Sequence, residues 1–233
     1  MSVNISLKNI SLKYPIYNTY KSFRSLITGK YKKKINIIKA LKNINLNIYK
    51  GEKVALLGRN GSGKTTLLKT IGGIYNPSEG ELIVNKKYST LFDIDMGMNN
   101  EATGLENIYL MGYLRGLNSK QIDEKLSKIV EFSELENFIN IPITAYSSGM
   151  IVRLATAIAI EINTDILLID EFFGAGDQKF KDKTVNVLIN KINEIETLVF
   201  ATHDLKLAKS ICNRFVTLED GQIIDDTKNI SGF

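Results

Sequence analysis

The sequence of 233 residues has one cysteine, one histidine and no long apolar run. A single cysteine, Cys212, excludes an internal disulfide and fits a reducing compartment. No segment reaches the roughly 18 to 20 apolar residues that a membrane-spanning helix needs. The first residues alternate apolar and polar side chains, which differs from the apolar core of a secretory signal. We therefore expect a soluble chain that is not exported.

The chain also lacks a linker. No stretch rich in proline, glycine or serine and no shift in composition marks a boundary between domains, and no internal repeat is visible. Its length supplies ample material for a buried core. We therefore expect residues 1–233 to form a single domain.

Acidic residues are absent from residues 1–51, which hold eleven of the 30 lysines and arginines. The remaining 19 basic and 25 acidic residues give residues 52–233 a net charge of −6. The net charge of +5 is therefore the sum of a strongly basic N-terminal part and an acidic remainder. The 21–34 segment could contact anionic lipid, an acidic partner such as a membrane protein, or nucleic acid, or it could simply be solvated. No recognition-helix or aromatic pattern accompanies the charge, so we do not expect nucleic acid as a partner. The densest basic residues are Lys21, Arg24, Lys30, Lys32, Lys33 and Lys34.

Residues 58–65 match the phosphate loop of nucleoside-triphosphate-binding proteins, G-x-x-x-x-G-K-[ST], at every fixed position. A short apolar run precedes the loop and helical spacing follows it, as this motif requires. Glycines let backbone N–H groups approach phosphate oxygens, and the helix adds the positive end of its dipole. Lys64 would reach the β- and γ-phosphates, and the Thr65 hydroxyl would bind Mg2+. The residues expected to contact the nucleotide are Gly58, Asn60, Gly61, Ser62, Gly63, Lys64, Thr65 and Thr66.

Hydrophobic periodicity predicts an α/β fold. Period-two alternation predicts antiparallel strands over residues 3–8 and 41–48, with the basic insertion between them, and further strands over residues 80–84 and 88–92. Apolar runs predict buried parallel strands over residues 54–57, 166–169 and 198–201. Helical stripes cover residues 122–130, 151–162 and 185–192. We expect a phosphate-loop core with a mostly parallel sheet, an antiparallel β subdomain, and a helical subdomain at about residues 100–160.

Two carboxylates, Asp170 and Glu171, follow the predicted strand 166–169, where a strand of an open α/β sheet presents ligand-binding groups. Asp170 can hold Mg2+ directly or through water, and Glu171 can accept a proton from the water that attacks the γ-phosphate. Shortly before them, the segment Tyr-Ser-Ser-Gly-Met at 146–150 opens a striped helix. Hydroxyl and N–H groups at a helix N-terminus can bind a phosphate, which makes this segment a second candidate site.

The order of these motifs resembles that of ATP-binding-cassette (ABC) ATPases over essentially the whole chain. The order is the phosphate loop, the short segment at a helix start, the strand ending in Asp170 and Glu171, Gly-Ala-Gly-Asp177, and a strand ending in Thr202-His203. The resemblance implies that Tyr14 stacks on adenine and that His203, the only histidine, contacts the γ-phosphate. It further implies that ATP is contacted by the signature residues, here Ser147, Ser148 and Gly149. A loop aspartate at the dimer interface, here Asp177, is the fourth residue implied to contact ATP.

Two departures from the family pattern are visible. The usual signature is Leu-Ser-Gly-Gly-Gln, whereas this chain has Tyr-Ser-Ser-Gly-Met. The glutamine that the family usually has between the two nucleotide motifs is missing, and Asp93 is the nearest polar candidate. The chain resembles the branch of the family that exports O-antigen, capsule and teichoic-acid precursors. The resemblance lies in its signature, in the residues 152–155 that follow it, in the segment 103–109 and in the basic insertion. Some members of that branch carry a further C-terminal glycan-binding domain, which we do not expect within these 233 residues.

The resemblance implies a homodimer that holds two ATP molecules, each between the phosphate loop of one chain and the signature of the other. It also implies integral-membrane permease subunits as partners, Mg2+ as a cofactor, and a peripheral location on the cytoplasmic face of the inner membrane. Three alternatives remain open: transport of another substrate (a lipid, drug or small solute), action on nucleic acid or ribosomes, and a regulatory or scaffold subunit. Chromosome-maintenance relatives have a long coiled coil between phosphate loop and signature, and ribosome-acting relatives generally have two cassettes per chain. Neither feature is present here.

Overall fold

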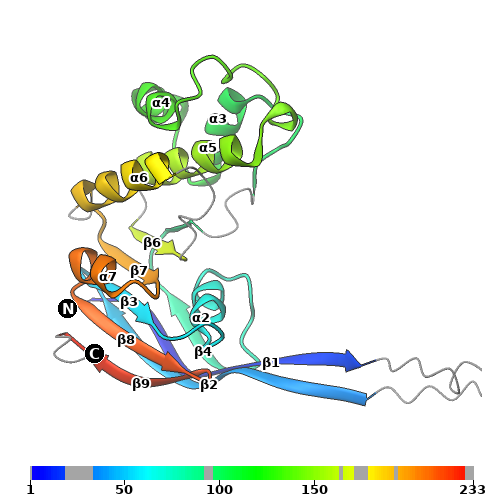
Figure 1. The fold of residues 1–233 in the computed structure, drawn as a ribbon, viewed down its shortest axis with the longest axis vertical. Coiled ribbons are helices and arrows are strands. Elements are labelled where there is room, and N and C mark those ends of the chain that lie inside the picture. The colour runs from blue at the N-terminus through cyan, green and yellow to red at the C-terminus, as the bar shows by residue number, and fades with distance from the viewer. Residues whose placement is uncertain are drawn as a thin grey trace, which may run out of the picture.

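The computed structural model describes residues 2–18, 34–91, 97–162, 165–170, 178–191 and 194–228. Figure 1 shows two parts, a lower part with the sheets and an upper part with most of the helices. The larger sheet has the order β5-β6-β7-β3-β8-β9. Its strands are β3 (Lys53–Leu57), β5 (Tyr88–Thr90), β6 (Ile166–Ile169), β7 (Thr197–Ala201), β8 (Arg214–Glu219) and β9 (Gln222–Thr227). All neighbouring strands of this sheet are parallel except β8 and β9.

The parallel strands β3, β6 and β7 are buried on both faces, which explains why their sequences are almost continuous apolar runs. Successive side chains of a strand point to opposite faces. In β3, Val54 and Leu56 therefore join the core against the smaller sheet and α2 (Lys64–Ile71), while Ala55 and Leu57 join the core under the other helices. The predicted strands 54–57, 166–169 and 198–201 are confirmed.

The smaller sheet is antiparallel, with the order β2-β1-β4. It consists of β1 (Val3–Asn18), β2 (Lys34–Tyr49) and β4 (Glu79–Val84). The strand predicted over residues 3–8 is much longer in the structure, where β1 continues to Asn18. The reason is that β2 starts at Lys34 and pairs with β1 to the end, with Tyr14 opposite Ile38. The paired ends of β1 and β2 project away from the rest of the molecule (Figure 1).

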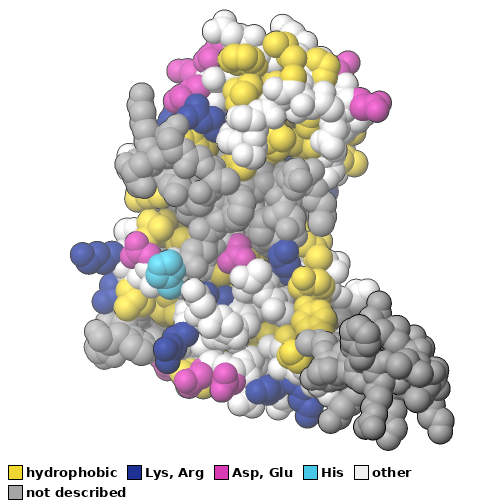
Figure 2. All heavy atoms as spheres, turned by 45° about the vertical axis from the view of Figure 1, so that its right-hand side comes forward, with side chains coloured by type: hydrophobic (Ala, Val, Ile, Leu, Met, Phe, Trp, Pro, Cys, Tyr) yellow, Lys and Arg dark blue, Asp and Glu magenta, His cyan; other side chains and the backbone are white. Residues whose placement is uncertain are grey.

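The helical part contains α3 (Gly104–Leu114), α4 (Ser119–Ser133), a short 3-10 helix (Ile143–Ala145), α5 (Ser148–Glu161) and α6 (Gln178–Lys191). The apolar stripes predicted α4, α5 and α6, whereas they did not delimit α3. Its start is marked by a capping box, in which Glu106 N–H donates to the Thr103 hydroxyl and Thr103 N–H donates to the Glu106 carboxylate. Hydrophobic side chains reach the surface of this part (Figure 2), among them Tyr113 and Leu114. In the part of the chain that the structure describes, no helix is long and apolar enough to span a membrane.

The C-terminal region holds elements that the periodicity did not predict, namely α7 (Leu205–Ile211), β8 and β9. The strand predicted over residues 88–92 ends in the structure at Thr90, although Leu91 N–H still donates to Leu168 O at 2.8 Å. Asp93 lies outside the described residues. The carboxyl ends of the parallel strands share one edge of the larger sheet, and the candidate site lies there.

Candidate functional site

Three segments with candidate site residues leave the same edge of the larger sheet. The phosphate loop follows β3, Asp170 follows β6, and His203 comes two residues after the end of β7. Because β7 lies between β6 and β3, the three segments start side by side. The hydrogen bond from Thr202 N–H to Leu56 O, at 3.1 Å, continues the pairing of β7 and β3 to the edge itself. Register thus brings together groups that are distant in sequence.

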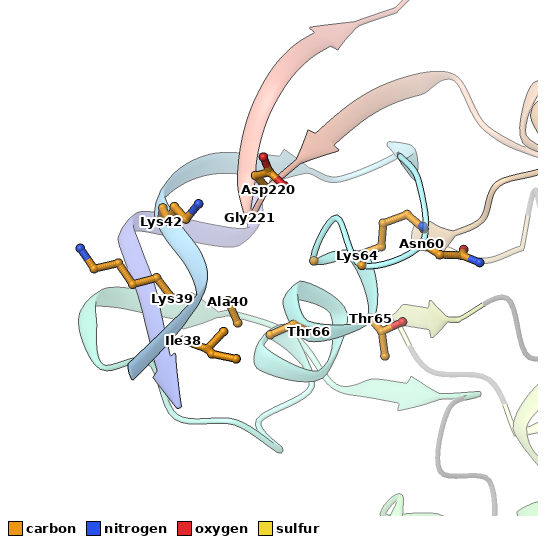
Figure 3. Close-up of a pocket in the computed structure, with 12 residues that line it drawn as sticks. Ile38, Lys39, Ala40, Lys42, Asn60, Lys64, Thr65, Thr66, Asp220 and Gly221 are labelled. Carbon is orange, nitrogen blue, oxygen red and sulfur yellow. The ribbon is translucent and has the colours of Figure 1, made fainter. Parts of the chain in front are cut away.

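Lys64 begins α2, and its side chain folds back over the phosphate loop, as Figure 3 shows. Its ammonium donates to Gly58 O at 2.7 Å and to Arg59 O at 3.2 Å. Burial lowers the pKa of Lys64 because it disfavours the charged ammonium, and the carboxylate of Asp170 partly opposes this effect. The half-buried Asp170 is therefore close enough to act electrostatically on Lys64. The loop thus holds a positive charge in place beside a carboxylate.

The inside of the loop fits a polyphosphate group. A Cβ atom at Gly58 would lie 2.3 Å from Leu218 O and 2.6 Å from the Ser62 hydroxyl, so only glycine fits there. Among the described residues, the Ser62 hydroxyl is one of two buried side-chain polar atoms that have no hydrogen-bond partner. A buried hydroxyl without a partner costs free energy, and a ligand oxygen that reached Ser62 would satisfy it. The free N–H groups at the start of α2 add further donors for an anion.

Two cavities flank the phosphate loop. The first, of about 490 Å³, lies between the loop, strand β2 and the turn that joins β8 to β9 (Figure 3). The second, of about 790 Å³, lies on the side of β8 and includes His203. Asn60, Gly61 and Asp220 line both. The predicted residues Lys64, Thr65, Thr66 and Gly63 line the first cavity, whereas Gly58 and Ser62 line the second.

Sequence reasoning missed one wall of the first cavity, formed by two segments far apart in the chain. These are residues 38–42 of β2 and the β8–β9 turn. The Asp220-Gly221 dipeptide of this turn is a recognised hairpin signal that could have revealed it. The β2 segment offers no local signal, because its place at the loop follows from tertiary packing alone. The missed residues are Ile38, Lys39, Ala40, Lys42, Asp220 and Gly221.

Tyr14 lies next to this wall. It pairs with Ile38 across β1 and β2, and opposite residues of paired strands point to the same face of a sheet. Its ring packs edge to face on Tyr75, with 5.6 Å between the centroids and 81° between the planes. Burial, with a smaller contribution from Tyr75, raises the pKa of Tyr14 to about 12. The residues that line the two cavities do not include Tyr14, so its contact with adenine stays a prediction.

The signature segment lies in the helical part, apart from the phosphate loop (Figure 1). Ser147 is the N-cap of α5, and its hydroxyl accepts a hydrogen bond from Met150 N–H at 3.2 Å. Ser148 is exposed and Gly149 half-buried. None of the described residues that line the two cavities comes from this segment. Within one chain, the structure therefore brings together the phosphate loop, Asp170 and His203, and leaves the signature separate.

Several predicted residues lie outside the described part of the chain. They are Glu171, Asp177, Asp93 and residues 21–33 of the basic segment.

Comparison with known proteins identifies the family. The model of the ABC transporter family matches residues 41–174. The O-antigen export system ATP-binding protein RfbE of Yersinia enterocolitica is 38% identical, over 97% of this chain and 99% of that protein. The teichoic acids export ATP-binding protein TagH of Listeria monocytogenes is 39% identical, over 95% of this chain and 66% of that protein. The chain spans 48% of a third relative, the O-antigen export system ATP-binding protein RfbB of Myxococcus xanthus, at 38% identity.

Solved structures show the same fold. A dimeric bacterial ABC transporter cassette superposes with a TM-score of 0.74 at 30% identity, over 98% of this chain and all of that one. A dimeric cassette in a post-hydrolysis state, bound to ADP and Pi, gives a TM-score of 0.75 at 29% identity with the same coverage. The chain belongs to the ABC transporter family. Within that family it is an ATP-binding cassette, the kind of subunit that binds and hydrolyses ATP.

Replacing Ser147 by alanine removes the N-cap of α5. We expect a loss of about 1 kcal/mol in the free energy of unfolding, because one N–H at the helix start loses its acceptor. Ser148→Ala is the matched control, because Ser148 is an exposed residue inside the first turn and no capping hydrogen bond of α5 involves it. Urea unfolding followed by circular dichroism measures both variants. Equal stabilities of the two variants would contradict the assignment of the cap.

Proposed function

We propose that the chain is the ATP-hydrolysing subunit of a transporter that exports a cell-surface polysaccharide or a lipid-linked glycan. The observation that carries this proposal is the similarity to RfbE of Yersinia enterocolitica, an O-antigen export ATP-binding protein, along nearly the whole of both chains. The similarity to teichoic acids export proteins points to the same class of cargo. In this proposal residues 1–233 form one cassette, with a helical subdomain at about residues 100–160.

In the proposed nucleotide site the phosphate loop holds the β- and γ-phosphates of ATP. Lys64 supplies positive charge, and the backbone N–H groups and the Ser62 hydroxyl supply hydrogen bonds. Thr65 and Asp170 would hold Mg2+, which neutralises phosphate charge when bound. The exposed Thr65 and the proximity of Asp170 to Lys64 support this assignment. Tyr14, on the same face as Ile38, is assigned to the adenine.

Hydrolysis in this proposal is an in-line displacement. The oxygen of a water molecule forms a bond to the γ-phosphorus, and the bond from that phosphorus to the oxygen bridging it to the β-phosphate breaks. Glu171 accepts the proton of the water, and ADP and inorganic phosphate leave. His203, which lines the cavity beside the loop, would contact the γ-phosphate. The shared sheet edge of the loop, Asp170 and His203 supports these roles.

The second half of each site would come from another copy of the chain. Ser147, Ser148 and Gly149 would contact the γ-phosphate bound by the partner's loop, and Asp177 would cross the interface. The separation of the signature from the cavities of its own chain and the dimeric state of the similar solved cassettes support this arrangement. ATP then joins the two copies, and its hydrolysis lets them separate and pull on the membrane partners.

The proposed membrane partner is an integral-membrane permease, contacted by the helical part around residues 93–117. Exposed apolar side chains support this choice, with Tyr113 52% and Leu114 66% exposed. The cassette would be peripheral, on the cytoplasmic face of the membrane, and the basic 21–34 segment would contact the membrane or the permease.

Replacing Glu171 by glutamine keeps the shape of the side chain and removes the proposed proton acceptor. We expect the turnover number for ATP to fall by about 100-fold or more, while ATP binding is retained. Glu124→Gln, at an exposed position of α4, is the control with the same chemical change. Phosphate release and equilibrium binding are measured on both. Hydrolysis by Glu171→Gln at the wild-type rate would show that the assigned base is wrong.

Replacing Gly149 by glutamate tests the dimer. A Cβ atom at Gly149 has only the Ser147 hydroxyl within 4 Å, at 3.8 Å, so the monomer accommodates the change. In the Glu171→Gln background we expect ATP to produce dimers, whereas the added Gly149→Glu abolishes them and leaves ATP binding unchanged. Ser127→Glu, on an exposed position of α4, is the control for the added charge. Light scattering after gel filtration measures the mass; dimers of the Gly149→Glu protein would rule out this role of the signature.

The cargo is tested by identifying the membrane protein that co-purifies with the tagged chain from its native membranes, and the reading frames beside its gene. We expect a permease encoded among glycan-assembly enzymes. A partner encoded with a solute-binding protein would instead indicate import of a small solute and would overturn the proposal of glycan export.

A further inference from the structure

The turn between β8 and β9 lies directly behind the phosphate loop. It consists of Asp220 and Gly221, both with positive φ, at 46° and 77°. Gly221 N–H donates to Ser62 O of the loop at 2.9 Å, and Gly221 O accepts a hydrogen bond from Lys42 N–H of β2 at 2.8 Å. One residue therefore joins the phosphate loop to strand β2 through its own backbone.

Gly221 has no room for a side chain, in addition to its positive φ. A Cβ atom at Gly221 would lie 2.4 Å from Ala40 O and 3.0 Å from Ala40 C. Strand β2 has little freedom to move aside, because Leu41 is completely buried and lies opposite Leu12 of β1. A side chain at position 221 would therefore push the turn away from β2, and the Ser62 contact would move with the turn.

The back of the loop touches the same elements elsewhere. A Cβ atom at Gly63 would meet Ala40 O at 3.2 Å and the Cα atom of Gly221 at 3.4 Å, and a Cβ atom at Gly58 would meet Leu218 O at 2.3 Å. Residues at both ends of the loop thus pack closely on β2, on the end of β8 or on the turn. A displacement of the turn is therefore transmitted to the loop at these contacts.

The geometry of one peptide unit connects this contact to the front of the loop. Ser62 C=O and Gly63 N–H belong to the same planar trans peptide, so they point in opposite directions. When Gly221 holds the Ser62 oxygen at the back, the Gly63 N–H is turned away from the turn. Gly63 itself lines the first cavity. The hydrogen bond from Gly221 therefore fixes the orientation of the Gly63 N–H, a donor that an anion held by the loop would use.

We propose that the Asp220-Gly221 turn braces the phosphate loop, and that Gly221 is a positioning residue that sets the affinity of the loop for the polyphosphate of a nucleotide. The proposal rests on the nucleotide site assigned above. It adds that this affinity depends on a hairpin at the far end of the chain, which does not itself need to touch the nucleotide.

Gly221→Ala tests the proposal, with Gly51→Ala as the matched control. Gly51 also has a positive φ, 87°, but a Cβ atom there has no neighbour within 4 Å. Both variants therefore strain the backbone, and only Gly221→Ala presses on β2 and the loop. We expect Gly221→Ala to raise the Kd for Mg-ATP and the KM by about tenfold or more, with kcat at saturating ATP within about twofold of wild type. Gly51→Ala keeps the wild-type Kd.

An equal loss of affinity in both variants, or an unchanged Kd in Gly221→Ala, would overturn the brace. Thermal unfolding without nucleotide accompanies these measurements. We expect Gly221→Ala to lose more stability than Gly51→Ala, because only its Cβ atom meets Ala40, and both variants to remain folded at the temperature of the binding assay. Failure of the wild-type chain to bind Mg-ATP is a different result, because it would overturn the proposed nucleotide site itself.

Hydrogen exchange in the unaltered chain gives an answer that does not depend on the folding of any variant. Mg-ATP orders the loop that carries the Ser62 acceptor, so we expect exchange of the Gly221 amide to slow by about tenfold. The Gly51 amide donates to Glu196 O, in a different loop, and serves as the reference, with unchanged exchange. Equal exchange of the Gly221 amide with and without Mg-ATP would overturn the inference.

Discussion

The register of three parallel strands is the constraint on which the candidate site depends. Leu56 of β3 pairs with Ala201 of β7, and Phe200 of β7 pairs with Ile169 of β6, so the three strands end at one edge. A slip of one residue would exchange the side chains that face the two cores, which differ in shape and partners. Since these strands are almost completely buried, such a slip would cost several kcal/mol for each large side chain that is misplaced. Packing therefore fixes the positions of the phosphate loop, Asp170 and His203 at this edge of the sheet.

The parts of the site that sequence predicted are those encoded locally. The phosphate loop is one contiguous motif, and the apolar runs that deliver Asp170 and His203 are long enough to identify as buried strands. The wall formed by residues 38–42 and the turn at Asp220 could not be predicted in the same way. Each segment looks ordinary alone, and only the contact of β2, β9 and the loop gives them a common role. The length of β1 was misjudged for a similar reason, because its extension exists through pairing with β2.

The unusual signature has a structural explanation in the helical core. Tyr146, where the family usually has leucine, is buried, and its hydroxyl donates to Phe138 O at 2.7 Å. Burial raises its pKa, which keeps the phenol protonated as this donation requires. Met150, in place of the usual glutamine, packs partly buried against the same core. The two departures at the ends of the segment thus concern packing, whereas Ser147 keeps the cap of α5 and Gly149 keeps a position without a side chain.

Helix α5, which begins at the signature segment, is joined to α6, the helix that follows Asp170 and Glu171 in the chain. Glu134, at the end of α4, accepts hydrogen bonds from Arg153 of α5 and Lys183 of α6, both at 2.9 Å. These ion pairs are partly exposed, and such pairs generally contribute about 1 kcal/mol or less. The buried rings of Phe132 and Phe180, 5.6 Å apart, contribute more through the apolar area that they remove from water. Phe132 belongs to α4 and Phe180 to α6, so this packing, which resists salt, joins α4 to α6. Helix α5 contacts the same pair through Arg153, whose guanidinium lies 5.1 Å from the centroid of the Phe180 ring. The three helices are therefore expected to move together at any ionic strength.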